Sequence, residues 1–186
     1  AASERVFAVL DLPVEDQKPD AIALPPARGD VEFRNVSFAY PKTERPTLRN
    51  INLSIRAGLN VAIVGPNGAG KTTLVNLIPR LFDPDGGTIL VDGQNIHDVT
   101  LKSLRDQIGM VTQDILTFND TIAVNIAYGK PGATQDEVVA AAKRAFAHEF
   151  ITQMPQGYDT LIGEHNAGLS GGQLQRIIIA RAILKN

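Results

Sequence analysis

The sequence contains no cysteine, which excludes disulfide bonds, thiolate metal sites and cysteine nucleophiles. It has no apolar run of the roughly 20 residues that cross a bilayer; stretches such as Ile177-Ile178-Ile179-Ala180 are far shorter. Neither sign of charge dominates, because 18 basic and 20 acidic residues leave a net charge of -2. We therefore expect no nucleic-acid partner, and any membrane attachment must come from other segments.

The N-terminus lacks an initiator methionine, and it lacks the basic start and apolar run of a signal peptide. With 186 residues, of which 44% are apolar, the chain is long enough for one core of ordinary size. We interpret the sequence as a piece of a longer protein.

Residues 1–28 are expected to form a helix end and then a linker, because apolar side chains at 6, 9 and 10 have helical spacing and four prolines fall between 11 and 29. Val31, Phe33, Val36 and Phe38 predict a strand with a bulge. Other alternating or apolar runs predict strands at 51–55, 60–64, 88–91 and 108–111. Amphipathic runs predict helices at 72–81 and 101–107, from a capping box at 134–137, and from 170 onward.

A phosphate-binding loop is predicted between the strand at 60–64 and the helix at 72–81. The pattern G-x-x-x-x-G-K-[ST] is matched by Gly65-Pro66-Asn67-Gly68-Ala69-Gly70-Lys71-Thr72. Glycines let successive backbone N–H groups turn toward phosphates, and the helix N-terminus adds partial positive charge. Lys71 would supply a full charge to the β and γ phosphates, and the Thr72 hydroxyl would bind Mg²⁺.

A second helix start has anion-binding character. Leu169-Ser170-Gly171-Gly172-Gln173 combines a hydroxyl with two glycines that allow close approach to backbone N–H groups. By itself this is a common helix start, but with the phosphate loop it resembles the ABC ATPase family, whose signature is LSGGQ. The run Val64 to Thr73 is similar to the Walker A sequence of that family, Tyr40 to its adenine-stacking A-loop, and Gln113 to its Q-loop.

The resemblance implies bound ATP and Mg²⁺ in a head-to-tail dimer with a second nucleotide-binding domain. The ATP site would include Tyr40, the loop 65–72, Thr73 and Gln113, and the metal ligands would be Thr72 and Gln113. Ser170, Gly171, Gly172 and Gln173 would contact ATP held by the other copy. Gln113 would sense the γ-phosphate where the core meets the helical lobe.

Three segments resemble the exporter branch of the family, namely 3–11, Gly163-Glu164, and 118–126. The first is similar to the connection from the last membrane helix and the second to the X-loop, which touches the coupling helices of a transmembrane domain. The third is similar to the stretch after the Q-loop of lipid and drug exporters. We therefore expect a protein at the cytoplasmic face of the inner membrane, exporting a lipid or drug-like substrate.

The family places a Mg²⁺-binding Asp, a catalytic Glu and a switch His after the signature helix, beyond the last residue of this sequence. His97, His148 and His165 all precede the signature or lie within the middle lobe, so none of them is assigned as the switch His. Glu164 matches the X-loop and is not assigned as the catalytic base. We expect a chain that binds ATP but is deficient in hydrolysis.

The expected fold is α/β of the P-loop NTPase class: a RecA-like core with an antiparallel β element and an inserted helical lobe, incomplete at the C-terminus. Residues 29–186 would be the nucleotide-binding domain, with the core at about 29–113 and the lobe at about 114–180. Two alternatives stay open, a soluble ABC ATPase without transport and a non-hydrolysing nucleotide-binding module. A free-standing importer ATPase is disfavoured by the N-terminal linker.

Overall fold

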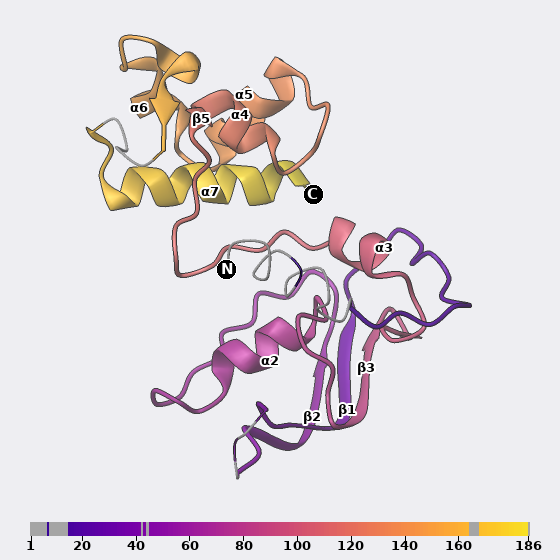
Figure 1. Ribbon diagram of the computed structural model, residues 1–186. Helices are drawn as coiled ribbons and strands as arrows, with labels where there is room; N and C mark the ends of the chain where they lie inside the picture. The colour runs from indigo at the N-terminus through magenta and orange to yellow at the C-terminus, as the bar shows by residue number, and fades with distance from the viewer. Residues whose placement is uncertain (1–6, 8–14, 42, 44, 164–167, 186) are drawn as a thin grey trace. The chain divides into compact units, whose positions relative to one another are not determined.

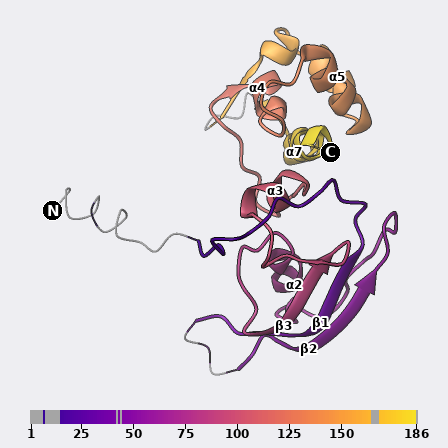
Figure 2. The ribbon, with the colours of Figure 1, turned by 90° about the vertical axis from the view of Figure 1, so that its right-hand side faces the viewer.

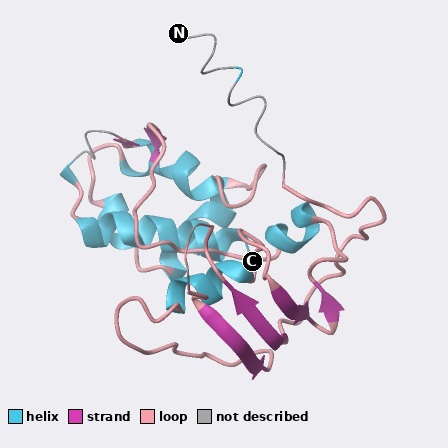
Figure 3. Ribbon diagram, turned by 60° about the horizontal axis from the view of Figure 1, so that its bottom comes forward, coloured by secondary structure: helices cyan, strands magenta, loops and turns pink. Residues whose placement is uncertain are grey.

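The computed structural model describes residues 7, 15–41, 43, 45–163 and 168–185. Two compact units make up the chain, residues 1–104 and residues 105–186 (Figure 1). The long strands belong to the first unit, and most helices belong to the second (Figure 3). None of the helices in the described part of the chain is long and apolar enough to span a membrane.

A four-stranded antiparallel sheet in the order β2-β1-β3-β4 forms the first unit. Its strands are β1 (Val31–Phe38), β2 (Leu48–Ile55), β3 (Gly86–Val91) and β4 (Gln94–Asn95). The helix α2 (Lys71–Leu77) lies beside β1, β2 and β3 (Figure 2). Strands predicted at 51–55 and 88–91 are thus confirmed within β2 and β3.

The predicted bulge in β1 is confirmed. Phe33 and Val36 are both buried, although residues three apart on a regular strand point to opposite faces. The pairing with β2 shifts between Phe33 and Val36, and Asn35 has a positive φ of 50°. The extra residue returns the apolar side chains to one face, where Phe38 is also buried.

Two predicted strands are wrong. Residues 60–64 and 108–111 have no ladder partner among the described residues, and Val64 is 87% exposed. An apolar run becomes a strand only when a neighbour pairs with its backbone N–H and C=O groups, which periodicity alone cannot reveal. The helix predicted at 72–81 is also shorter, because Pro79 removes a backbone donor and α2 ends at Leu77.

Residues 15–28 lie along the first unit. Ile22 forms a parallel bridge with Val99, and Leu24 is buried while its N–H donates to the Ser103 Oγ at 2.8 Å. Ser103 belongs to α3 (Leu101–Asp106), which confirms the predicted short helix. The helix end expected near the start of residues 1–28 lies outside the described residues, apart from Phe7.

Helices dominate the second unit. They are α4 (Ile122–Ala127), α5 (Gln135–Arg144), α6 (His148–Thr152) and α7 (Gly171–Lys185), with the 3-10 turn η1 (Gly157–Asp159). Two short strands, β5 (Asp120–Thr121) and β6 (Leu161–Ile162), pair antiparallel. The capping box predicted for α5 is confirmed, since Thr134 and Glu137 exchange side-chain and backbone hydrogen bonds.

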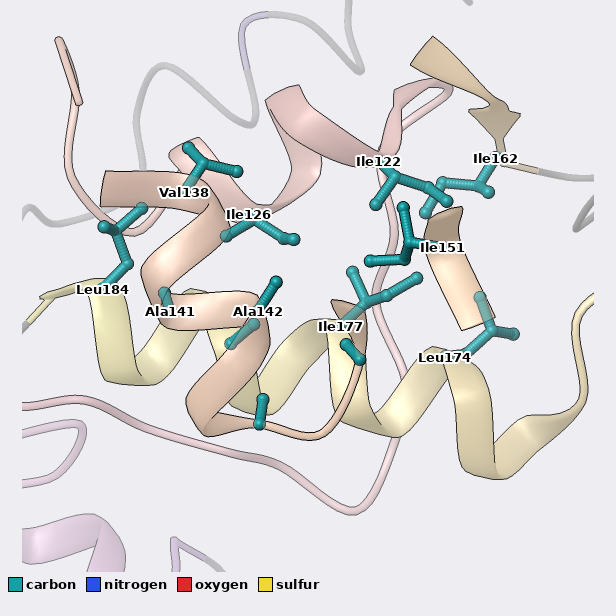
Figure 4. Packing of buried hydrophobic residues seen from close by; sticks show 13 residues of the cluster. Ile122, Ile126, Val138, Ala141, Ala142, Ile151, Ile162, Leu174, Ile177 and Leu184 are labelled. Atoms are coloured by element: carbon teal, nitrogen blue, oxygen red, sulfur yellow. The ribbon is translucent and has the colours of Figure 1, made fainter. Parts of the chain in front are cut away.

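The core of the second unit forms around α7. Its buried side chains come from α4, α5, α6, β6 and α7, and Ile122, Ile126, Ile151 and Ile177 are fully buried (Figure 4). Small residues of α5, such as Ala142, let the helices approach closely. This core positions the helix start at Ser170.

Candidate nucleotide-binding site

The loop 65–70 leads into the N-terminus of α2. Gly70 precedes the helix in the left-handed region, with a φ of 85°. A Cβ atom at Gly70 would lie 2.9 Å from the Leu48 Cδ2 and 3.2 Å from the carbonyl oxygen of Thr47. Both the backbone conformation and the close approach to the start of β2 therefore require glycine here.

Lys71 crosses back over this loop. Its Nζ donates to the carbonyl oxygens of Gly65 at 2.9 Å and of Pro66 at 2.8 Å. These two bonds hold an ammonium group beside the first turn of α2, where the helix dipole also favours an anion. The positive charge and the helix N-terminus thus act on the same small volume.

A cavity of about 320 Å³ opens at this point. Its lining is made by residues from the end of β1, the start of β2, the loop and α2: Tyr40, Thr47, Gly68, Ala69, Gly70, Lys71, Thr72 and Thr73. The sequence singled out all of these except Thr47, which carries no chemical signal in its local pattern. Gly65, Pro66 and Asn67 lie in the same loop outside the lining.

Aromatic side chains hold Tyr40 at one side of the cavity. The rings of Phe38 and Phe82 meet the Tyr40 ring edge-on, with centroid distances of 5.0 and 5.3 Å. The Tyr40 hydroxyl lies 3.0 Å from the Thr73 Oγ1, and either group can donate. Sequence reasoning missed Phe82, which follows α2 in a turn.

The cavity suits a metal–phosphate group better than a bare metal ion. In the described residues no three His, Asp or Glu side chains gather into a metal site. Mg²⁺ keeps several waters and takes few protein ligands when phosphates complete its coordination. The Thr72 hydroxyl, a hard oxygen donor on the cavity wall, fits that role.

The second unit holds the other predicted site residues. Gln113 is exposed in the loop between α3 and α4, and the Thr112 Oγ1 donates to the Asp114 carbonyl oxygen at 2.7 Å. Gly163 lies against Asn119, whose Oδ1 would be 2.6 Å from an added Cβ. Glu164 and His165 fall outside the described residues.

Ser170 and Gln173 form a reciprocal cap at the start of α7. The Gln173 N–H donates to the Ser170 Oγ at 3.3 Å, and the Ser170 N–H donates to the Gln173 Oε1 at 2.8 Å. Gly171 and Gly172 are exposed, and an added Cβ would meet nothing within 4 Å at either position. The signature segment is therefore an open helix start.

Hydrogen bonds of the half-buried Arg181 join α7 to α4 and to the segment before α4. The Arg181 guanidinium donates to the Asn125 carbonyl oxygen and Oδ1 and to the Leu116 carbonyl oxygen, at 2.7, 3.0 and 3.0 Å. Its Cζ also lies 5.3 and 5.9 Å from the ring centroids of Phe118 and Tyr128, whose rings are tilted against each other at 33°. Partial burial lowers the pKa of Arg181 from its usual value, although a guanidinium keeps its charge throughout the physiological range.

Comparison with known proteins identifies the family. The profile of the ABC transporter family matches residues 48–186. The chain belongs to this family. It is 56% identical over 187 aligned residues to an ATP-dependent lipid A-core flippase of Syntrophus aciditrophicus, covering 100% of this chain and 31% of the relative. A protein of the same name from Chromobacterium violaceum is 51% identical over 188 residues, covering 100% of this chain and 32% of that protein.

A solved structure described as a bacterial Atm1-family ABC exporter with ATP bound has 48% sequence identity and a TM-score of 0.91, covering 99% of this chain and 32% of that one. The predicted P-loop NTPase fold is therefore confirmed. This ABC transporter chain spans about a third of the length of the relatives that it matches.

Proposed function

We propose that this chain is the ATP-binding part of an ABC exporter, which couples binding and hydrolysis of ATP to export of a lipid or drug-like substrate. The observation that carries the proposal is the cavity at the start of α2, which Lys71, Thr72 and Tyr40 line together. The names of the flippase and exporter relatives support transport over a soluble ABC ATPase.

Three side chains of the cavity, those of Lys71, Thr72 and Tyr40, have assigned parts in this proposal. Lys71 presents its ammonium to the β and γ phosphates, and the N–H groups of the loop and α2 bind phosphate oxygens. Mg²⁺ would neutralise phosphate charge when bound, with Thr72 and Gln113 as its protein ligands. The ring of Tyr40 stacks on adenine.

A second nucleotide-binding domain is the proposed partner at the open start of α7. Ser170, Gly171, Gly172 and Gln173 would close head-to-tail on the γ-phosphate held by the other copy. Support comes from the exposed glycines, which leave the N-terminus of a 15-residue helix accessible to an anion.

A transmembrane domain is the proposed partner of the second unit, at the cytoplasmic face of the inner membrane. Its coupling helices would dock on the aromatic pair Phe118 and Tyr128, which are 42% and 62% exposed. Leu116, 69% exposed, extends this apolar surface. Arg181 beneath the rings would fix their position relative to α7.

Hydrolysis by the isolated 186-residue chain should be slower by orders of magnitude than in a complete ABC ATPase. The residues assigned to the ATP site bind and position, and none is placed as the general base. Saturable ATP binding without steady turnover is the expected result. A rate equal to that of an intact ABC ATPase would refute this part of the proposal.

The test is ATP binding by the chain and by its Lys71→Ala variant, measured by calorimetry with Mg²⁺. Loss of hydrogen bonds from a charged group predicts an affinity lower by about 10- to 100-fold. Lys143→Ala, on the exposed side of α5, is the matched control and should bind as the unchanged chain does. If the Lys71→Ala variant binds ATP as tightly as the control, the proposed ATP site at this cavity is wrong.

A further inference from the structure

The side chain of Tyr40 is fixed from three sides. Phe38 and Phe82 meet its ring at interplanar angles of 82° and 84°, and its hydroxyl is hydrogen-bonded to Thr73. Phe38 and Phe82 also contact each other, at a centroid distance of 5.5 Å. The three rings form one cluster, so the Tyr40 ring has little freedom to turn.

Thr73 is the polar member of this arrangement. It lies in the first turn of α2 and is only 4% exposed, yet it follows directly on Lys71 and Thr72 in the wall of the cavity. A buried hydroxyl needs a hydrogen-bond partner, and the Tyr40 hydroxyl supplies one at 3.0 Å. The bond therefore links the side chain at the end of β1 to the helix that begins the phosphate site.

We infer that Thr73 and Phe82 are positioning residues which hold the Tyr40 ring as a preformed platform for a purine base. A side chain ordered before binding avoids the entropy cost of being ordered by the ligand. Base–aromatic stacking is sequence-tolerant and depends on the ring being in place. Thr73 and Phe82 thus determine how strongly the base, as distinct from the phosphates, contributes to affinity.

This inference rests on the proposed ATP site, and the experiment keeps the two apart. The complete gene product is titrated with ADP and with inorganic pyrophosphate, both with Mg²⁺. ADP carries the base but avoids turnover, and pyrophosphate carries only the phosphates. If neither ligand binds the unchanged protein, the proposed function and this inference both fail.

Tyr40→Phe keeps the ring and removes the hydroxyl. Loss of one neutral hydrogen bond predicts ADP affinity lower by about two- to tenfold, with pyrophosphate affinity unchanged. Tyr158→Phe is the matched control, because it removes a hydroxyl bonded to His148 in the second unit and should leave both affinities unchanged. If Tyr40→Phe binds ADP as tightly as the unchanged protein, the inference is overturned while the proposed function survives.

Thr73→Val keeps the shape and removes the other hydroxyl. If Thr73 acts on the base through Tyr40, then Thr73→Val in the otherwise unchanged protein should lower the ratio of ADP affinity to pyrophosphate affinity. In the Tyr40→Phe variant, where the hydrogen bond is already absent, Thr73→Val should leave this ratio unchanged. Phe82→Leu should lower the same ratio. Additive effects of the two hydroxyl deletions on the ratio would overturn the link between Thr73 and Tyr40. If Phe82→Leu lowers the ADP and pyrophosphate affinities equally, Phe82 has a structural role and does not position the Tyr40 ring.

Discussion

The two units differ in how they bury their apolar side chains. The second unit buries the apolar sides of α4, α5, α6 and α7 against one another. The first buries one face of its sheet, but Leu59, Val61, Ile63 and Val64 are between 38% and 87% exposed. A helix satisfies its backbone hydrogen bonds internally, whereas a strand needs a neighbour. A helical unit can therefore close its core with local elements, and a sheet unit depends on every strand that pairs with it.

The largest expected effect tests this contrast in stability. Ile177→Ala in the 186-residue chain removes atoms from a fully buried position and should lower the free energy of unfolding of the second unit by about 2–5 kcal/mol. Val64→Ala, at an exposed position, should change stability by less than about 0.5 kcal/mol. Urea denaturation followed by circular dichroism measures both. Equal losses would mean that residues 60–64 are packed as well as α7.

Close packing within the second unit predicts the next effect. A Cβ at Gly129, in the turn after α4, would lie 2.1 Å from the Arg181 carbonyl oxygen, so Gly129→Ala forces this turn and α7 apart. Overpacking of this kind costs about 1–3 kcal/mol. Gly172→Ala, where an added Cβ meets nothing, is the control and should leave the denaturation midpoint unchanged or slightly raised. A stable Gly129→Ala variant would contradict the tight contact.

The close packing around Gly70 in the first unit predicts an effect on ADP binding. Gly70→Ala places a side chain in the left-handed region and against Leu48, and the backbone penalty alone is about 1–2 kcal/mol. We expect ADP affinity about tenfold lower. Gly86→Ala, which has open space and no positive φ, should bind normally. Calorimetry with ADP measures the affinity of both variants. A loss at Gly70 alone would show that the loop requires glycine at this position; equal affinities would contradict it.

The smallest effect concerns acid stability of the second unit. The side-chain hydrogen bond from Lys130, followed by the backbone N–H of Thr134, lowers the pKa of Glu137 from 4.5 to about 2. Because the folded pKa is below the unfolded value, the stabilisation is complete above about pH 4.5 and is lost as the pH falls toward 2. The melting temperatures of the unchanged chain and of Glu137→Gln should therefore converge over this window. A constant difference would show that Glu137 stays protonated or acts through packing alone.

The sequence predicted the parts whose signals are local. The bulge near Asn35, the capping box of α5 and the glycine–lysine loop each depend on a few neighbouring residues. The strands expected at 60–64 and 108–111 failed, because their formation depends on partners that hydrophobic pattern does not identify. For the candidate site, Thr47 and Phe82 were missed because their roles come from tertiary contact with Gly70 and Tyr40.

The reciprocal cap at α7 has a consequence for the chemistry of Ser170. A serine hydroxyl has one hydrogen and two lone pairs, and the bond from the Gln173 N–H occupies only a lone pair. The cap thereby turns the oxygen toward the helix and leaves the hydroxyl hydrogen to be given to an incoming acceptor. The hydroxyl hydrogen can still rotate about the Cβ–Oγ bond, so the folded helix start holds the oxygen in place and keeps one side-chain donor beside the exposed residues Gly171 and Gly172.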